Sequence, residues 1–310
     1  MKRSMQMFAV SALAAGVAAC GGGGDGSASG STGTVSFNMT DAPAMEFTDV
    51  TVAFTGIRLK HEDGEWVEFT FDQPKTWNLL DLQGGMSEPL ITDEEVPAGD
   101  YTELRLMVDT DPNRTFVATA SKPDEHKSLA IPSGEQSGLK LKGNFIVAAD
   151  TTTDFTIDFN VAKSIVNPQG QSLADYLLKP SLRLTNTLET GSITGDVDFA
   201  TINQNQDCEG VSEGYTGSVY VYQGADITPT DVNVETEGGP LMTVPVKYDD
   251  SKGIYTYTAA YLTEGDYTIS YTCQLDDNET TDDTVKFEDK QTVSVVAGEK
   301  TQADSFPLTP

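Results

Sequence analysis

The sequence predicts an all-β protein with two antiparallel β-sandwich domains, which follow a signal peptide and a flexible linker. From Val35 onward, apolar and polar residues alternate in short runs, which is the period of a strand with one buried face. Gly, Asp and Asn separate these runs at intervals of about ten residues, as in a sandwich. Only Ser172–Leu178 has a helical pattern, and that segment is short.

The first half contains a strong hairpin signal. Thr51–Lys60 and Glu65–Phe71 flank Asp63-Gly64, a dipeptide that favours a tight turn. The apolar phase slips by one residue at Gly56, where a β-bulge would absorb the slip. Further strands are predicted at Thr102–Val108, Leu139–Val147, Phe155–Phe159 and Ser181–Thr187.

The second half has the same character. Strands are predicted at Ser218–Tyr222, Thr243–Tyr248, Ile254–Ala260, Tyr267–Cys273, Thr284–Phe287 and Thr292–Val296. Both halves contain Gly-Asp-Tyr-Thr followed by alternating residues, at 99–102 and 265–268, which indicates related architecture. The pattern changes near Glu189–Ser192, so the predicted domains are residues 34–189 and 190–310.

The first twenty residues have the features of an export signal. Lys2 and Arg3 are followed by Met7–Ala19, an uncharged and mostly apolar stretch of 13 residues. A helix that spans a bilayer needs about 20 residues, so this stretch suits a signal peptide instead. The segment Val17–Cys20 (VAAC) resembles the lipobox of bacterial lipoproteins. The resemblance implies a signal peptide at residues 1–19, cleavage before Cys20 and lipidation of that cysteine.

The residue after the cysteine bears on location. It is Gly21 and not the Asp that often signals retention in the inner membrane. We therefore predict a lipid anchor in the outer membrane, with the protein on its periplasmic or surface face. An ordinary signal peptide that ends by chance in a cysteine is the alternative. Residues 20–33 form a Gly/Ser-rich linker whose root-mean-square span is about 20 Å.

The charge balance of the chain disfavours two classes of partner. The chain has 48 Asp and Glu residues against 19 Lys and Arg, a formal charge of −29. Loss of Lys2 and Arg3 with the signal peptide makes the mature chain −31. Such a surface repels nucleic acid and anionic lipid headgroups, and it attracts cations. General adaptation, for example to a salty habitat, explains the acidity equally well.

Two cysteines remain after lipidation, Cys208 and Cys273. An even pair in an oxidising compartment predicts a disulfide, which would close a loop of about 66 residues. A two-cysteine metal site is the alternative, but His61 and His126 are far away in the sequence.

No catalytic constellation is recognisable, so we predict a protein that is not an enzyme. A nucleophile needs a base beside it. His61 lies at the tip of the predicted hairpin and His126 in the polar loop Lys122–Lys127, and we expect both to be solvated. No pair of carboxylates stands out among so many acidic residues.

No cofactor is predicted, and calcium is a hypothesis only. Asp109, Asp111 and Asn113 match the opening of a calcium loop, but Arg114 replaces its glycine and Ala120 its bidentate glutamate. An EF-hand is therefore excluded. A looser site is the remaining hypothesis, built from Asp109 and Asp111 or from the aspartate pairs at 249–250, 276–277 and 282–283; solvated turns are the alternative.

The aromatic residues allow two interpretations. We expect Trp66 on the strand face opposite Val67, Phe69 and Phe71, and Trp77 in the core. Tyr220 and Tyr222 lie on one predicted strand, as do Tyr255 and Tyr257 on another. Such residues pack a sheet face, or they contact a glycan or protein.

With these residues in place, the first half resembles a bacterial lipoprotein family, domain-of-unknown-function family 4382, from about Gly33 to Thr187. The motifs that carry this resemblance are Thr40–Pro43, Val50–Lys60, Trp66, Asn78–Leu82, Val96–Tyr101, Ile157–Phe159 and Leu178–Pro180. The resemblance implies export and a β-sandwich-like fold, and it brings no established activity or catalytic residues.

The second half is similar to transthyretin-like or carboxypeptidase-regulatory-like β-sandwiches. The similarity rests on Glu264–Thr268 and Val296–Thr301, followed by Phe306 and Leu308. Such domains serve as spacers, adhesion modules or binders of glycan or protein, an inference by analogy of fold.

The sequence thus predicts a lipid-anchored protein of the cell envelope that acts as a non-enzymatic binding or assembly module. Its partners would be the membrane, through the lipid, and an envelope protein or a glycan. A carbohydrate-binding module, assisted by calcium, is the alternative.

Replacement of Cys20 tests the anchor. We expect Cys20→Ser to move the protein from the membrane fraction to the soluble fraction, because the variant has no thiol to acylate. Immunoblotting of fractionated cells measures this. Cys208→Ser is the matched control and should stay in the membrane fraction; retention of Cys20→Ser there would contradict the anchor.

Overall fold

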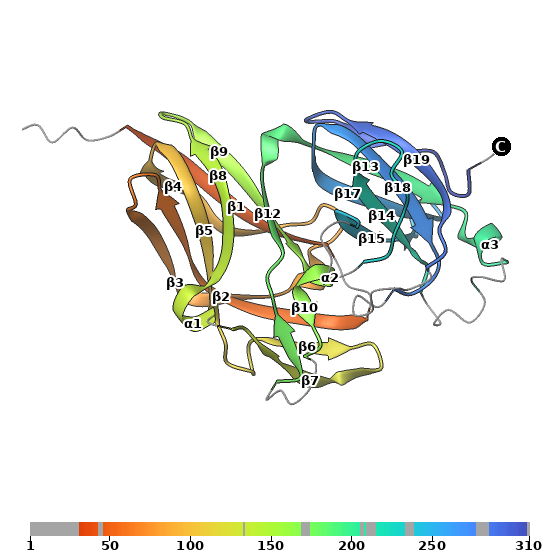
Figure 1. Ribbon diagram of the computed structural model, residues 1–310, viewed down its shortest axis with the longest axis horizontal. Coiled ribbons are helices and arrows are strands. Elements are labelled where there is room, and N and C mark those ends of the chain that lie inside the picture. The colour runs from red at the N-terminus through yellow and green to blue at the C-terminus, as the bar shows by residue number, and fades with distance from the viewer. Residues whose placement is uncertain are drawn as a thin grey trace, which may run out of the picture. The chain divides into compact units, whose positions relative to one another are not determined.

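The computed structural model describes residues 31–42, 46–132, 134–168, 174–204, 208, 215–232, 239–276 and 285–308. The predicted signal peptide, Cys20 and most of the linker lie outside these residues. In the described part, strands dominate and form four sheets (Figure 1). The prediction of an all-β fold is confirmed.

The first sheet has four strands. In the order of the sheet they are β12 (Leu182–Asn186), β9 (Thr152–Asn160), β1 (Thr32–Ala42) and β4 (Glu88–Pro97). β1 runs antiparallel to β4 and parallel to β9, so both of its edges are hydrogen-bonded. Among the described strands, β12 pairs only with β9 and is one edge of the sheet.

The second sheet has eight strands. Its order is β10 (Ile165–Val166), β11 (Tyr176–Leu178), β7 (Lys122–Ala130), β6 (Phe116–Thr119), β2 (Phe47–His61), β5 (Gly99–Asp109) and β8 (Leu139–Val147), and β3 (Trp66–Asn78) pairs with β2. The β2–β3 hairpin was predicted, and its register shifts between Phe54 and Gly56, as the bulge required. A side chain at Gly56 would press against the Phe69 carbonyl oxygen, so only glycine fits there.

Residues 190–302 form the other two sheets. One has the order β16 (Lys247–Asp249), β17 (Ile254–Thr263), β13 (Thr190–Val197) and β20 (Lys300–Gln302). The other has the order β15 (Met242–Pro245), β14 (Ser218–Gln223), β18 (Gly265–Thr272) and β19 (Glu288–Val295). Strands therefore change sheets between β12 and β13, close to the predicted boundary. The division into two domains stays a prediction.

The described helices are single turns: α1 (Gly134–Ser137), α2 (Val161–Ser164), α3 (Phe199–Ile202), η1 (Leu79–Asp81) and η2 (Thr187–Glu189). Side chains cap most of them; Asn160 accepts from the Lys163 amide, and Asp198 from the Thr201 amide. No helix in the described part of the chain has the length and apolarity needed to cross a membrane.

Two hydrophobic clusters fill the space between the sheets. The first includes Phe37, Phe155 and Phe159 from one sheet and Phe54 and Leu104 from the other. The second includes Val219 and Ile269 on one side and Ile193 and Tyr257 on the other. These residues alternate with polar ones along their strands, which is the pattern that predicted the sandwiches.

β14 is buried on both faces. Val219 and Val221 belong to the second cluster, whereas Tyr220 and Tyr222 point the other way and belong to the first. Packing of a sheet face and contact with a glycan or protein were the two interpretations of these tyrosines, and their almost complete burial supports packing. β14 thus joins the two cores.

Several local predictions were wrong. Tyr176–Leu178, expected in a helix, forms β11 because it pairs with β10 and β7; residues 172–173 lie outside the described part. Thr243–Tyr248 is not one strand, since β15 and β16 belong to different sheets and separate at Val246. Residues 285–287 are irregular, and the strand begins at Glu288.

The pairing is not wholly antiparallel. β1 with β9, β7 with β11, and β13 with β20 are parallel pairs. Parallel neighbours require a long connection, which an alternating pattern in single strands does not reveal.

Cys208 and Cys273 form a disulfide in which the Cα atoms are 5.6 Å apart. This agrees with the pairing predicted from the sequence. Both cysteines are buried in the second cluster, so the bridge also packs against the core.

Removal of the disulfide should lower the stability of the protein. For the double variant Cys208→Ala/Cys273→Ala we expect a loss of about 2–5 kcal/mol in the free energy of unfolding, because the open chain has a larger unfolded-state entropy. Urea denaturation of the two proteins measures the difference. Reduction of the wild type should reproduce the loss, and an unchanged midpoint after both treatments would contradict a stabilising bridge.

Candidate functional site

A groove of about 540 Å³ lies between β8 and β12. β8 contributes residues 141–146, β12 contributes residues 182–186, and Phe155 of β9 lies between them. Volumes of this size are typical of binding sites. The groove thus lies between the edge strands of the two sheets of the first half.

Both strands that flank the groove are sheet edges. Among the described residues, β8 is hydrogen-bonded only to β5, and β12 only to β9. Each strand therefore presents one row of backbone N–H and C=O groups that no neighbouring strand satisfies. Such rows can pair with another extended chain.

The lining of the groove is apolar in its depth and mixed at its rim. Leu141, Phe145 and Phe155 are almost fully buried and belong to the first core. At the rim, the Ile146 side chain is 63% exposed. Leu188, on the turn between the lining residues Asn186 and Glu189, is 72% exposed. These two are the most exposed large apolar residues described, and both lie at or next to the rim of the groove.

The charged residues of the groove are few. Arg183 is held by the Asp158 carboxylate at 2.8 Å and donates to the Tyr261 carbonyl oxygen at 3.0 Å. Glu189 accepts from the Asn186 amide at 3.0 Å. Lys142 is exposed, and no ion pair is found for it among the described residues. This arrangement can bind an extended chain non-covalently.

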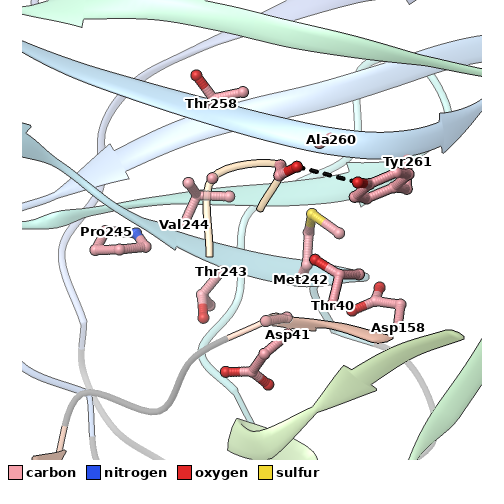
Figure 2. Close-up of a pocket in the computed structure, with 13 residues that line it drawn as sticks. Thr40, Asp41, Asp158, Met242, Thr243, Val244, Pro245, Thr258, Ala260 and Tyr261 are labelled. Atoms are coloured by element: carbon pink, nitrogen blue, oxygen red, sulfur yellow. Dashed lines mark hydrogen bonds between the residues drawn. The ribbon is translucent and has the colours of Figure 1, made fainter. Parts of the chain in front are cut away.

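A second cavity lies where Thr40 and Asp158 meet β15 and β17 (Figure 2). Its volume is about 20 Å³, which suits one water molecule. The Tyr261 hydroxyl closes one side by donating to the Gly85 carbonyl oxygen at 3.0 Å (Figure 2). A space this small excludes a substrate, so we interpret the cavity as a structural joint.

Two buried carboxylates flank this joint. Thr40 pairs with Asp158 in the parallel β1–β9 ladder, and the next residue, Asp41, points to the opposite face of the sheet (Figure 2). One oxygen of Asp41 accepts from the Val161 amide at 3.3 Å. The other Asp41 oxygen and one oxygen of Asp158 are buried without a hydrogen-bond partner in the described part. Burial, and then the charge of Asp158, raise the pKa of Asp41 well above its usual value.

The predicted calcium ligands lie together in one turn. Asp109 forms an ion pair with Arg114 at 2.9 Å, and Asp111 accepts from the Asn113 backbone and side-chain amides at 2.9 and 2.8 Å. These contacts engage Asp109, Asp111 and Asn113, the three residues predicted to coordinate the cation. Among the described residues, no group of three or more His, Cys, Asp or Glu is placed to hold a metal ion. Calcium at this turn stays a hypothesis, and residues 277, 282 and 283 lie outside the described part.

The two histidines differ from each other. His61 was expected to be solvated, but its side chain is only 13% exposed and packs edge-on against the Tyr101 ring. The end of β2 lies beside the start of β5, and this neighbour covers the imidazole. His126 is exposed, as expected, but it lies in β7 and not in a loop, and it stacks on Phe116.

The two tryptophans lie as predicted. Trp77 packs against the first core. Trp66 lies on the outer face of β3, with the guanidinium carbons of Arg58 and Arg105 at 4.9 and 4.5 Å from the ring centroid. Three cations, including Lys60 at 5.9 Å, therefore crowd the indole. This occupies the ring face that a neutral sugar would stack on.

The sequence did not predict the groove. Its one local signal is the Lys-x-Lys pattern at 140 and 142 in the strand Leu139–Val147, because lysines are frequent on edge strands. That both edges face one groove depends on pairings between distant segments, which local patterns do not reveal.

Comparison with protein families finds a match to the first half of the chain. Residues 32–180 match the family model described as a domain of unknown function, DUF4382. This confirms the resemblance drawn from the motifs. No curated protein matches the chain.

Solved structures show only distant similarity to the chain. The Bacillus anthracis TIE protein has a TM-score of 0.19 at 10% identity, over 88% of this chain and 50% of its own. The minor pilin GBS52 of Streptococcus agalactiae has a TM-score of 0.19 at 11% identity, over 89% of this chain and 97% of its own. A fimbrial protein of Bacteroides ovatus has a TM-score of 0.21 at 12% identity, over 88% and 48%. The chain thus spans about half the length of the first of these. Similarity at this level establishes neither a shared fold nor a shared function.

The buried Asp41 should make stability depend on pH. Its raised pKa means that the folded state binds this proton more tightly than the unfolded state, so stability falls as pH rises from the unfolded value of about 3.9 through the folded value. We therefore expect Asp41→Asn to stabilise the protein at pH 7 and to have little effect near pH 4. Thermal unfolding of both proteins across this pH range measures the difference.

Asp158→Asn is the control for this prediction. It should destabilise the protein, by on the order of 3 kcal/mol, because the half-buried Arg183 loses its carboxylate. If Asp41→Asn raised the stability equally at pH 4 and pH 7, the prediction that Asp41 titrates with a raised pKa would be wrong.

Proposed function

Residues 32–180 match the DUF4382 family model, and on this premise we propose that the chain is a lipid-anchored assembly protein of the cell envelope without enzymatic activity. Its groove between β8 and β12 binds an extended segment of a partner protein. The observation that carries the proposal is the pair of free strand edges that face this groove.

The binding mode follows from strand geometry. An extended segment beside β8 would continue the hydrogen-bonded ladder of the eight-stranded sheet. Its side chains would alternate between two directions. Those that point inward would cover Phe145 and Leu184, and those that point outward would lie next to Lys142. A segment with apolar and acidic residues in alternation therefore fits best.

The edges also resist indiscriminate pairing. β8 carries two lysines and a register shift between Tyr101–Phe145 and Glu103–Lys142, and β12 has only five residues. Lysines, bulges and short length are the devices by which natural sheets avoid aggregation. A partner must therefore match the groove with its side chains as well as its backbone.

The lipobox at Val17–Cys20 and the Gly/Ser linker support a place at the membrane surface. A tethered body whose linker spans about 20 Å stays close to envelope proteins and sees them at a high local concentration. Sugar stacking on Trp66 receives less support, because cations crowd the indole ring.

Site-specific cross-linking in intact cells tests the proposal. A photoreactive amino acid replaces Ile146 at the groove or, as the control, Ile254, which is 39% exposed and outside the groove. We expect position 146 to cross-link to an extended segment of one protein, identified by mass spectrometry, and position 254 not to do so. The same products from both positions would contradict a groove-specific partner.

A second variant separates binding from proximity. Leu188→Glu should weaken the cross-link from position 146 about tenfold, since the loss of one apolar contact at an interface costs about 1.4 kcal/mol. Leu275→Glu, at a leucine that is 44% exposed elsewhere, should leave the cross-link unchanged.

A further inference from the structure

One sheet face gathers positive charge in this acidic chain. Two rows cross the outer face of the eight-stranded sheet, from β3 through β2 and β5 to β8. The rows are Glu68–Arg58–Arg105–Lys140 and Trp66–Lys60–Glu103–Lys142, in which each residue is the direct cross-strand partner of the next. We call these eight residues the basic face.

The basic face has a charge of +3, from five cations and two carboxylates. Residues 31–189 contain only 12 Lys and Arg, against 25 Asp and Glu, so nearly half of the cations lie in this one place. Charges more than about 8 Å away are largely screened at physiological ionic strength. A ligand at this face therefore responds to the local positive charge rather than to the acidic remainder.

The two arginines are held in position. Arg58 pairs with Glu68, and Arg105 pairs with Glu103 at 2.6 Å. Both guanidinium groups also lie over the Trp66 ring. Their side chains are 25% and 21% exposed, so an incoming anion would meet groups that are already ordered.

The lysines are free to pair with a ligand. Lys140 and Lys142 are exposed, and Lys60 is half-buried beside Trp66. Within the described part of the chain, no carboxylate lies within ion-pair distance of any of the three.

Edge protection explains only part of this arrangement. Lysines at β8 would guard a free edge, but β2 and β5 lie inside the sheet, where no edge needs protection. Arg58 and Arg105 are direct cross-strand partners, and like charges opposite each other destabilise a sheet. Glu68 and Glu103 offset part of this repulsion, and a bound anion would offset more of it.

We propose that the basic face binds an acidic polysaccharide. Cations two residues apart on a strand are about 7 Å from each other, and the five cations lie on three neighbouring strands, β2, β5 and β8. A linear polymer with repeated anionic groups therefore meets several cations at once. None of the exposed large apolar side chains belongs to the basic face; Ile146 lies on β8 but beyond the register shift. Membrane insertion and a protein interface would both need an apolar centre.

The ligand is probed with polygalacturonate, a linear chain with one carboxylate per sugar, and with dextran as the neutral control. The purified full-length protein is titrated by calorimetry at low salt and at physiological salt. We expect binding of polygalacturonate that weakens as salt rises, and no binding of dextran. Equal binding of both polymers, or none of polygalacturonate at low salt, would overturn the proposal.

Two matched double variants locate the site. Lys60→Gln/Lys140→Gln removes two cations of the basic face and leaves every residue that lines the groove unchanged. Lys247→Gln/Lys300→Gln removes two exposed lysines of the second half, for the same change in net charge. We expect at least a tenfold loss of affinity in the first variant and little change in the second, with unfolding curves like that of the wild type. Equal losses in both would overturn the assignment to this face.

Anionic phospholipid vesicles form the last comparison. We expect weaker binding to vesicles than to polygalacturonate. Vesicle binding that is tighter, and that is lost in the Lys60→Gln/Lys140→Gln variant, would assign the face to a membrane surface and overturn the polysaccharide.

Discussion

The described structure depends on one strand that has no solvent-exposed face. β14 places Val219 and Val221 in one hydrophobic cluster and Tyr220 and Tyr222 in the other. A buried tyrosine must find a partner for its hydroxyl. Tyr220 donates to Asp276 at 2.7 Å, and Tyr222 donates to the Thr230 carbonyl oxygen at 2.5 Å. Asp276 in turn accepts from the Val232 amide, so this strand also orders the segments around it.

Contacts near the C-terminal end of β1 also connect the two halves of the chain, at the joint where Thr40 and Asp158 meet β15 and β17. Arg183 reaches from Asp158 to the Tyr261 carbonyl oxygen, and Asn160 donates to the Leu241 carbonyl oxygen at 3.1 Å. Asp41, Asp158 and their neighbours belong to the motifs by which the first half resembles its family. These two aspartates therefore serve packing at the joint, whereas Arg58, Lys60 and Trp66 of the basic face belong to other motifs of the same resemblance.

Local sequence patterns predicted the features that depend on interactions within a single strand. Leu139–Val147 was predicted with the bounds of β8, and the phase slip at Gly56 predicted a bulge, because alternation and glycine sterics act within one strand. The disulfide followed from the parity of the cysteines. Tyr176–Leu178 was misassigned because its pairing with β7 and β10 outweighs a weak helical pattern. The burial of His61 and the basic face arise from the register between β2, β3, β5 and β8, which no single strand contains.

The position of β1 has a mechanical consequence. The linker enters the described body at Ser31, and the next residue begins a strand that is bonded to β4 on one side and to β9 on the other. Tension applied at the N-terminus and directed along β1 would load both ladders in shear, so many hydrogen bonds would have to break together. β12, which lines the groove, is the neighbour of β9 in the same sheet, so the groove lies next to the loaded pair β1 and β9. If the protein is anchored and occupied as proposed, a pull between the anchor and the groove would be carried across a short, hydrogen-bonded path that does not pass through the second half of the chain.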